Sequence, residues 1–568
     1  MRRGASLDYD PHMSASADLA ALAARTWERT LELNPTFATV LGDERFDDRL
    51  DDPGPDGRAA RRSLAVDTVA GAAAIDPAGL DQEDRITRDL LILVSEQEII
   101  EDDIRADLIP FWGMGGHQAL LPEIVHLQQA DTPERLERLL GRIAAYPALT
   151  DAIIELLAEG RAAGLTASRV VADRAVDQLE RLLASPADES PIVTVPGLAD
   201  EAGRGRLLDA VERHVRPADA RYLDALREYL PATRDDPGLC ALPDGEARYA
   251  AKVRAYTSLD LTPAELHRIG LEELATIEDE RRSIAGAAGF SEDTAAYRDA
   301  MNADPAQIAP TPEALVARCQ EDVERAFLVA PHWFNRIPKV GCEVRRVEPL
   351  LEKDAPGAYY YPPTMDGSRP GIYFVNAYDL PSRTYWTAAS TTYHEAVPGH
   401  HFQLALEMEL DGLPAFRTLG FWPQGTAYVE GWALYTERVA DEAGLFRSEA
   451  ERFGMLDSQA LRAVRLVVDT GLHAFGWTRQ KAFETMVAAG IHPTDAGIET
   501  DRYIAWPGQA LAYMTGRREI ERLRLERQRR EGPAFDIRRF HDDVLGHGKL
   551  PLSILADVVL GATEAPRS

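Results

Sequence analysis

The segment from residue 393 to 403, YHEAVPGHHFQ, constrains the fold of this chain more than any other. It holds three of the 13 histidines and one carboxylate, Glu395. Glu395 is the only Asp or Glu between Asp379 and Glu407, and the residues around it are largely apolar. Burying an isolated carboxylate costs free energy unless hydrogen bonds or a metal ion receive it. The segment therefore predicts a polar site inside a packed core.

A histidine followed directly by a glutamate begins the zincin motif. In that motif two histidines four positions apart on one helix bind zinc, and the glutamate activates a water molecule. Here His394 and Glu395 open the pattern, but Pro398 stands where the second histidine belongs. The next candidates for the second ligand are His400 and His401.

Pro398 and Gly399 bear on whether His394 and His400 can meet. Positions six apart on a straight helix point about 120° away from each other and cannot share an ion. Pro398 offers no backbone N–H and clashes with the carbonyl of residue 394, while Gly399 tolerates unusual backbone angles. We therefore predict a bulge in the helix that brings the two imidazoles to one ion. His401 lies two turns away on the face of His394 and is the alternative ligand; incidental histidines in a kinked core helix are the other interpretation.

A third ligand is available in YVEGWALYTE, residues 428–437. Glu430 is the only charged residue between Arg417 and Glu437, and it lies in an apolar, helix-like run. Three protein ligands with one open position are typical of catalytic zinc, whereas structural zinc has four. We predict that His394, His400 and Glu430 bind one Zn²⁺ and that Glu395 is the general base. The alternative is that Glu430 only caps or pairs on its helix.

These two motifs carry a resemblance to a known family. HEAVPGHHFQ and YVEGWALYTE, together with NPTFATVLGDERFDDRL, GIYFVNAYDLPSRTYW and WPGQALAYMTG, resemble the bacterial family called domain of unknown function 885. The resemblance spans nearly the whole chain. It implies a mostly helical fold of the gluzincin metallopeptidase type, and it implies no particular substrate.

The chain is expected to be mainly α-helical, with a small β-sheet beside the helix of the His-Glu motif. Apolar residues at helical spacing dominate, and a composition change near residues 231–246 suggests a boundary. We predict a disordered tail at 1–14, a helical region at 15–240 and a catalytic region at 241–568, forming one helical fold around a cleft. Three short aromatic or β-branched runs follow residue 341, and GIYFVNA (371–377) is our candidate for the edge strand that binds an extended substrate. Tyr373 and Asn376 of this strand are predicted substrate contacts.

Further site residues are expected downstream. An amide-hydrolysing site needs donors for the oxyanion that forms on the carbonyl. By the resemblance to gluzincins, a downstream tyrosine and histidine line the cleft, so we predict catalytic roles for Tyr513 and His473, the latter oriented by Asp469 four positions earlier. Tyr503 and Arg517 are predicted to bind substrate. A core position with a satisfied polar end is the alternative for the tyrosines and the histidine. We also predict an ion network on a helix surface, formed by Arg462, Arg465 and Asp469.

Composition narrows the remaining function classes. The 568 residues include 62 basic and 93 acidic side chains, a net charge of −31, which disfavours binding to nucleic acid or anionic membranes. The three cysteines give no disulfide framework, the N-terminus lacks the apolar core of a secretory signal, and no run approaches 18 apolar residues. We therefore expect a cytoplasmic protein. Serine-hydrolase, NTPase and dinucleotide-binding motifs are missing.

The favoured hypothesis is a zinc-dependent peptidase or amidase acting on a peptide or a small amide. Two alternatives remain open from the sequence. One is a helical binding or scaffold protein with a degenerate metal site, suggested by the broken spacing. The other is a metal enzyme of another class, such as an iron enzyme with a two-histidine, one-carboxylate site. The sequence predicts no oligomeric state.

Overall fold

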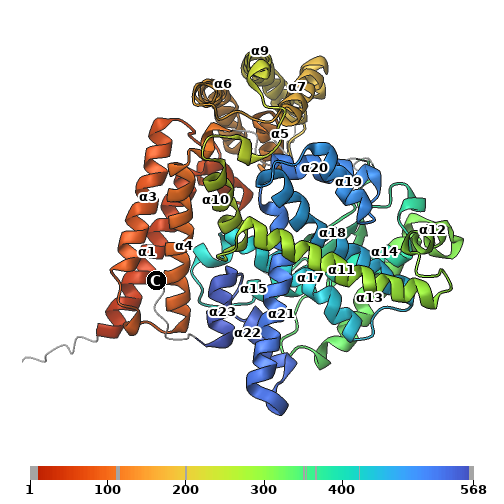
Figure 1. Ribbon diagram of the computed structural model, residues 1–568. Coiled ribbons are helices and arrows are strands. Elements are labelled where there is room, and N and C mark those ends of the chain that lie inside the picture. The colour runs from red at the N-terminus through yellow and green to blue at the C-terminus, as the bar shows by residue number, and fades with distance from the viewer. Residues whose placement is uncertain are drawn as a thin grey trace, which may run out of the picture.

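The protein is mainly helical with one small sheet, as predicted (Figure 1). This computed structural model describes residues 11–109, 116–198, 201–349, 352–353, 355–364, 367–420 and 422–561. Most of the predicted tail, residues 1–10, lies outside the described residues, and the first helix begins at Pro11, inside the predicted tail. In the part of the chain described, no helix is long and apolar enough to cross a membrane.

The N-terminal half consists of helices in two groups. Figure 1 shows α1, α3 and α4 side by side, and α5, α6, α7 and α9 gathered at the top of the view. Helix starts follow local signals: Thr132 accepts a hydrogen bond from the backbone N–H of Arg135, with Pro133 at the first position of α6. The bounds are α1 (Pro11–Leu33), α2 (Pro35–Val40), α3 (Pro55–Ala73), α4 (Gln82–Asp103), α5 (His117–Leu127), α6 (Pro133–Ala162), α7 (Arg169–Ala184), α8 (Glu201–Ala210) and α9 (Arg216–Tyr229).

A second series of helices leads to the sheet. Local sequence sets the start of α11, where Thr262 and Glu265 form a reciprocal capping box. Helix α10 packs against both α4 and α17, so contacts cross the predicted boundary near residue 240. The division of the chain into two regions at this boundary stays a prediction. The bounds are α10 (Gly245–Thr257), α11 (Pro263–Ala287), α12 (Thr294–Ala303) and α13 (Pro312–Val329).

The sheet has the three predicted strands in the order β1-β3-β2. They are β1 (Cys342–Arg346), β2 (Ala358–Tyr361) and β3 (Gly371–Val375). Strand β3 pairs in parallel with β1 and antiparallel with β2. The prediction that GIYFVNA is the edge strand is therefore wrong, because β3 is central and both of its sides are paired. The strand that contacts α14 at the edge of the sheet is β2.

The C-terminal helices enclose the centre of the molecule. Helices α17 and α21 approach closely because Gly431 and Gly516 face each other: a Cβ on Gly431 would lie 2.4 Å from the Cα of Gly516. This contact fixes the helix turn that carries Glu430. The bounds are α14 (Tyr385–Glu395), α15 (His400–Met408), α16 (Ala415–Leu419), α17 (Thr426–Glu442), α18 (Glu449–His473), α19 (Arg479–Ala488), α20 (Pro493–Ala505), α21 (Ala512–Glu531), α22 (Ile537–Leu545) and α23 (Leu552–Leu560).

Candidate metal centre

The break between α14 and α15 brings two histidines together. Helix α14 ends at Glu395 and α15 begins at His400. The segment therefore forms two helices, and our prediction of a single helix with a bulge is wrong. The backbone leaves the helical region at Ala396 (φ −103°, ψ −102°) and Gly399 (φ −76°, ψ −125°), and the Val397–Pro398 bond is cis. The rings of His394 and His400 lie 4.9 Å apart and nearly perpendicular.

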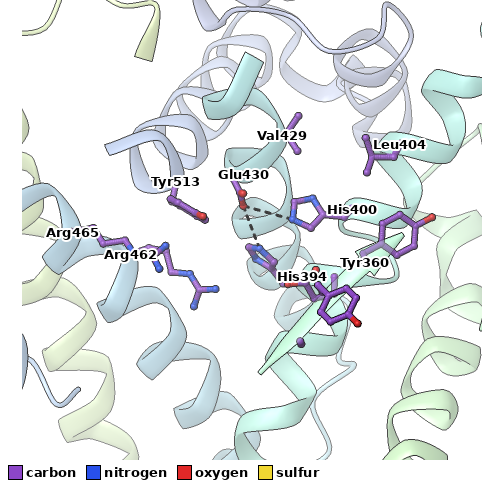
Figure 2. Close-up of a pocket in the computed structure, with 12 residues that line it drawn as sticks. Tyr360, His394, His400, Leu404, Val429, Glu430, Arg462, Arg465 and Tyr513 are labelled. Atoms are coloured by element: carbon purple, nitrogen blue, oxygen red, sulfur yellow. Dashed lines mark ion pairs between the residues drawn. The ribbon is translucent and has the colours of Figure 1, made fainter. Parts of the chain in front are cut away.

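The third member of the cluster is Glu430, from the first turns of α17. Its Oε2 lies 3.6 Å from Nε2 of His394 and 3.6 Å from Nε2 of His400 (Figure 2). One nitrogen from each histidine and one carboxylate oxygen lie within 4.8 Å of one another. The separation of 3.6 Å is too long for a hydrogen bond. The structure thus brings together the three predicted ligands, with a space between their donor atoms.

The charges of the cluster are strongly coupled. Burial alone would raise the pKa of Glu430, but His394 and His400 outweigh it and hold that pKa well below its ordinary value. Burial would lower the pKa of His394, yet Glu430 and Glu437 raise it to about 9. Glu430 is therefore an anion, and protons compete with any cation for the histidine nitrogens.

Glu437 is a member of this site that sequence reasoning missed. Its fully buried carboxylate lies 2.9 Å from Nδ1 of His394. Burial would raise the pKa of Glu437, but the hydrogen bond from His394 and the charge of Arg462 lower it, so the carboxylate is ionised and only accepts. His394 therefore donates from Nδ1 and turns Nε2 toward Glu430. The sequence did indicate that Glu437 lies near the site, because Glu437 follows Glu430 by seven positions and so lies on the same helix face.

His401, the alternative ligand, is not part of the cluster. Its Nδ1 lies 2.8 Å from the hydroxyl of Tyr360, and its Nε2 lies 3.1 Å from the carbonyl of Val340. Burial lowers its pKa to about 4, so the ring is neutral at physiological pH. Both nitrogens have partners on the side of the sheet, which leaves the ring a structural role.

A cavity of about 350 Å³ opens beside the cluster (Figure 2). Two of the predicted catalytic residues, Glu395 and Tyr513, lie in its wall. Strand β2 contributes to the wall where we predicted β3. The complete lining is Ala358, Tyr359, Tyr360, His394, Glu395, His400, Leu404, Val429, Glu430, Arg462, Arg465 and Tyr513.

His473, the other predicted catalytic residue, does not line this cavity and is a core residue. Its Nδ1 accepts a hydrogen bond from the backbone N–H of Leu239 at 3.2 Å, and its Nε2 donates to the carbonyl of Tyr503 at 3.0 Å. Asp469 does not orient it, because that carboxylate accepts from the hydroxyl of Tyr249 at 2.6 Å and from the N–H of Gly508. Burial lowers the pKa of His473 to about 4.

The predicted substrate contacts Tyr503 and Arg517 lie behind the cavity wall. The hydroxyl of Tyr503 accepts from Nε of Arg465 at 2.9 Å. Nη1 of Arg517 donates to Oε1 of Gln459 at 2.8 Å, and Nε2 of Gln459 donates to Glu437 at 2.9 Å. Both residues support side chains that reach the site, and neither is among the residues that line it.

Tyr373 and Asn376 are also buried supports and not substrate contacts. The side-chain amide of Asn376 donates to the backbone carbonyls of Glu352, Ala355 and Pro356 at 2.6 to 3.1 Å, which holds the loop before β2. Tyr373 is 1% exposed. Neither residue is among those that line the cavity.

Two arginines of α18 line the cavity, contrary to our interpretation of them as a surface network. Arg465 is 5% exposed, and its guanidinium carbon lies 4.3 Å from the ring centre of Tyr513. Arg462 extends toward the cavity in Figure 2. The sequence held a signal for this, since a helix that is apolar on most of its faces is buried and its few charged residues then lie inside the protein.

These observations define a class of protein: a mainly helical chain with a two-histidine, one-glutamate cluster in the wall of a cavity. The chain belongs to the family described as bacterial protein of unknown function (DUF885), which matches residues 35–559. The match confirms the family resemblance carried by the sequence motifs. No curated protein sequence shows significant similarity to the chain.

Two solved structures share the fold. A candidate lipoprotein from Colwellia psychrerythraea is 26% identical, with a TM-score of 0.86 over 96% of this chain and 98% of that one. A candidate lipoprotein of unknown function from Shewanella oneidensis is 19% identical, with a TM-score of 0.77 over 95% of this chain and 99% of that one. The likeness covers nearly the full length of each chain, so the overall fold is common to them.

Proposed function

We propose that this protein is a zinc-dependent hydrolase that cleaves peptide or amide bonds, with a gluzincin-like arrangement of its catalytic helices. One observation carries the proposal: Nε2 of His394 and Nε2 of His400 each lie 3.6 Å from Oε2 of Glu430, at the wall of a cavity that also holds Glu395. The order of these residues along α14, α15 and α17 is that of a zincin site whose first helix is interrupted.

The donor set fits a zinc ion. Zinc bonds to imidazole nitrogen and carboxylate oxygen are about 2.0–2.1 Å long, which places tetrahedral donors about 3.4 Å apart. The separations of 3.6 Å to Glu430 are close to this value. Glu437 fixes His394 with Nε2 inward, as carboxylates do for metal-binding histidines. The cavity gives access to the open side of the cluster, which a catalytic site requires.

Bound zinc would supply a Lewis acid that polarises an amide carbonyl and lowers the pKa of water. Glu395 follows His394 directly and faces the same cavity, so its carboxylate is placed to take a proton from the attacking water. The same carboxyl group then delivers that proton to the leaving amine, so that amide and water give a carboxylic acid and an amine. Tyr513, held against Arg465, is a hydrogen-bond donor for the oxyanion.

Metal analysis of the protein purified without added metal tests the proposal against its alternatives. About one zinc per chain supports it. Iron would indicate the other two-histidine, one-carboxylate chemistry. A protein that binds neither metal would be the helical binding protein with a degenerate site.

Glu395→Gln tests the general base. The variant should keep its metal and lose hydrolysis, because a neutral amide cannot accept the proton. The control is Glu442→Gln, at the surface end of α17, where the side chain is 44% exposed and paired with Arg524. Turnover by Glu395→Gln within tenfold of the wild type would exclude Glu395 as the base.

The cellular location belongs to the same proposal. The sequence favours the cytoplasm, whereas both solved relatives are described as candidate lipoproteins. If that description extends to this chain, the enzyme acts at a membrane surface and its substrates are extracytoplasmic peptides. Fractionation of cells that make the full-length protein distinguishes the two locations.

A further inference from the structure

Arg462 lines the cavity without a direct ion pair. Its Nη1 donates to the hydroxyl of Ser458 at 2.6 Å and to the carbonyl of Ser458 at 3.2 Å. Its Nε is buried without a hydrogen-bond partner. In the described ranges, no carboxylate lies within 4.0 Å of this guanidinium, and it reaches Glu437 only through the Ser458 hydroxyl. The guanidinium therefore has hydrogen bonds to Ser458 but no carboxylate in direct contact.

Arg465 adds a second cation, with one buried nitrogen that has no hydrogen-bond partner. Its Nη2 pairs with Glu499 at 2.8 Å, and its Nε donates to Tyr503 at 2.9 Å. The side chain of Arg465 is 94% buried, and yet its Nη1 has no hydrogen-bond partner. A buried, unpaired donor on a charged group is costly, so its presence in a cavity wall indicates a ligand that completes it.

The opposite side of the cavity is different in character. Tyr359 and Tyr360 of β2, with Leu404 and Val429, supply mainly apolar surface. Figure 2 shows Arg462, Arg465 and Tyr513 on one side of His394 and Glu430, and Tyr360 and Leu404 on the other. The volume of about 350 Å³ is near the lower end for small-molecule sites. A small ligand with one anionic end and one apolar end fits these walls.

We propose that the substrate is a small amide carrying a free carboxylate, which Arg462 and Arg465 bind while the scissile amide lies beside Glu395. The inference rests on the proposed hydrolase function, and it names the substrate class. Guanidinium groups bind carboxylates through paired, charge-assisted hydrogen bonds, so a carboxylate in the cavity would give Arg462 a direct ionic partner and place an anion beside Arg465. The carboxylate belongs either to the C-terminal residue of a short peptide or to an acidic side chain.

Binding of product-like probes tests the carboxylate site without turnover. In the first pair of probes, N-acetylalanine has a terminal carboxylate where N-acetylalaninamide has an amide. In the second pair, N-acetylglutamic acid α-amide has a side-chain carboxylate where N-acetylglutaminamide has an amide. Titration calorimetry on the zinc-loaded full chain should show one acid binding at least about tenfold more tightly than its amide. The pair that shows the preference identifies the source of the carboxylate.

Substitutions assign the preference to the arginines. Arg462→Gln should reduce it about tenfold or more, and Arg462→Lys should retain part of it because a single charge remains. Arg462 has few contacts, so both variants should fold. Arg452→Gln is the matched control, since Arg452 is on the same helix and pairs with Asp441 away from the cavity.

Three results would overturn the inference. Equal binding of acids and amides to the wild type removes the carboxylate site. An acid preference that survives Arg462→Gln, or that disappears when zinc is removed while Arg462 is intact, places the carboxylate on the metal cluster. If instead the preference follows Arg462 but no amide is hydrolysed, the carboxylate site stands and the proposed hydrolase function fails.

Discussion

Glu437→Gln is the substitution that most directly tests how the cluster is held. Glu437 accepts four hydrogen bonds in the core, from Nδ1 of His394, Ser390, Ser458 and Gln459 at 2.9 to 3.2 Å. Glutamine keeps the size of the side chain and removes its charge. It also introduces an amide N–H₂ beside four groups that all donate hydrogen bonds to Glu437 in the wild type.

The structure sets the size of the effect. The charge-assisted bond to His394 is the kind that contributes about 1.5–3 kcal/mol. Gln459 cannot turn its amide to accept from the new N–H₂ without losing Arg517, which donates to its Oε1 at 2.8 Å, and the carbonyl of Leu434, to which its Nε2 donates at 3.1 Å. One donor therefore stays unpaired, which costs about 1–3 kcal/mol of folding free energy. We expect zinc affinity to fall about 10- to 100-fold.

Chelator competition measures the zinc affinity, and thermal unfolding of the metal-free protein measures the folding cost separately. Glu442→Gln, on the surface of the same helix, should change neither quantity. A folded Glu437→Gln variant whose zinc affinity stays within twofold of the wild type would refute the reasoning. Glu437 would then stabilise the core without orienting His394.

Three other predictions concern the cluster and a buried carboxylate in the core. His400→Ala should abolish zinc binding in equilibrium dialysis while His401→Ala retains it, and the reverse result would make His401 the ligand. Gly399→Ala should destabilise the protein by about 1–3 kcal/mol in denaturant titrations, because its Cβ would lie 1.8 Å from the carbonyl oxygen of His394; Gly497→Ala, with open space around the Cβ, is the control. Burial raises the pKa of Asp469 to about 7, so the folded state binds the extra proton between about pH 4 and 7, and stability falls as pH rises through that range. Asp469→Asn should therefore gain stability relative to the wild type, by up to about 4 kcal/mol above pH 7, and a gain independent of pH would contradict this assignment.

Local features of the fold were predictable from the sequence, and pairings over long distances were not. The caps at Thr132 and Thr262 depend on residues within one turn, so their patterns are visible in the sequence. The three strands were also visible as short runs. The order of the strands in the sheet was not visible. Strand β1 pairs with β3 and not with β2, the next strand in the sequence, and no local pattern specifies that choice.

The cluster was predictable in composition but not in form. His394, His400 and Glu430 come together as the motifs indicated. The helix does not bulge at Pro398; it ends, and a new helix starts. At this break Gly399 lies so close to the carbonyl of His394 that no Cβ fits there. Sequence spacing shows that a straight helix fails, but it does not show which alternative path the backbone takes.

The polar residues that sequence reasoning wrongly assigned to the site share one physical property. His473 and Asn376 are buried with their polar atoms already bonded to backbone groups, so they complete the core and have nothing left to offer a ligand. Arg462 and Arg465 each keep a buried nitrogen without a partner, and both line the cavity. Residue type and spacing along the chain do not show which polar residues reach the cavity. What separates them is whether the fold satisfies every donor and acceptor, and that depends on partners up to about 230 positions away in the chain, such as Leu239 for His473.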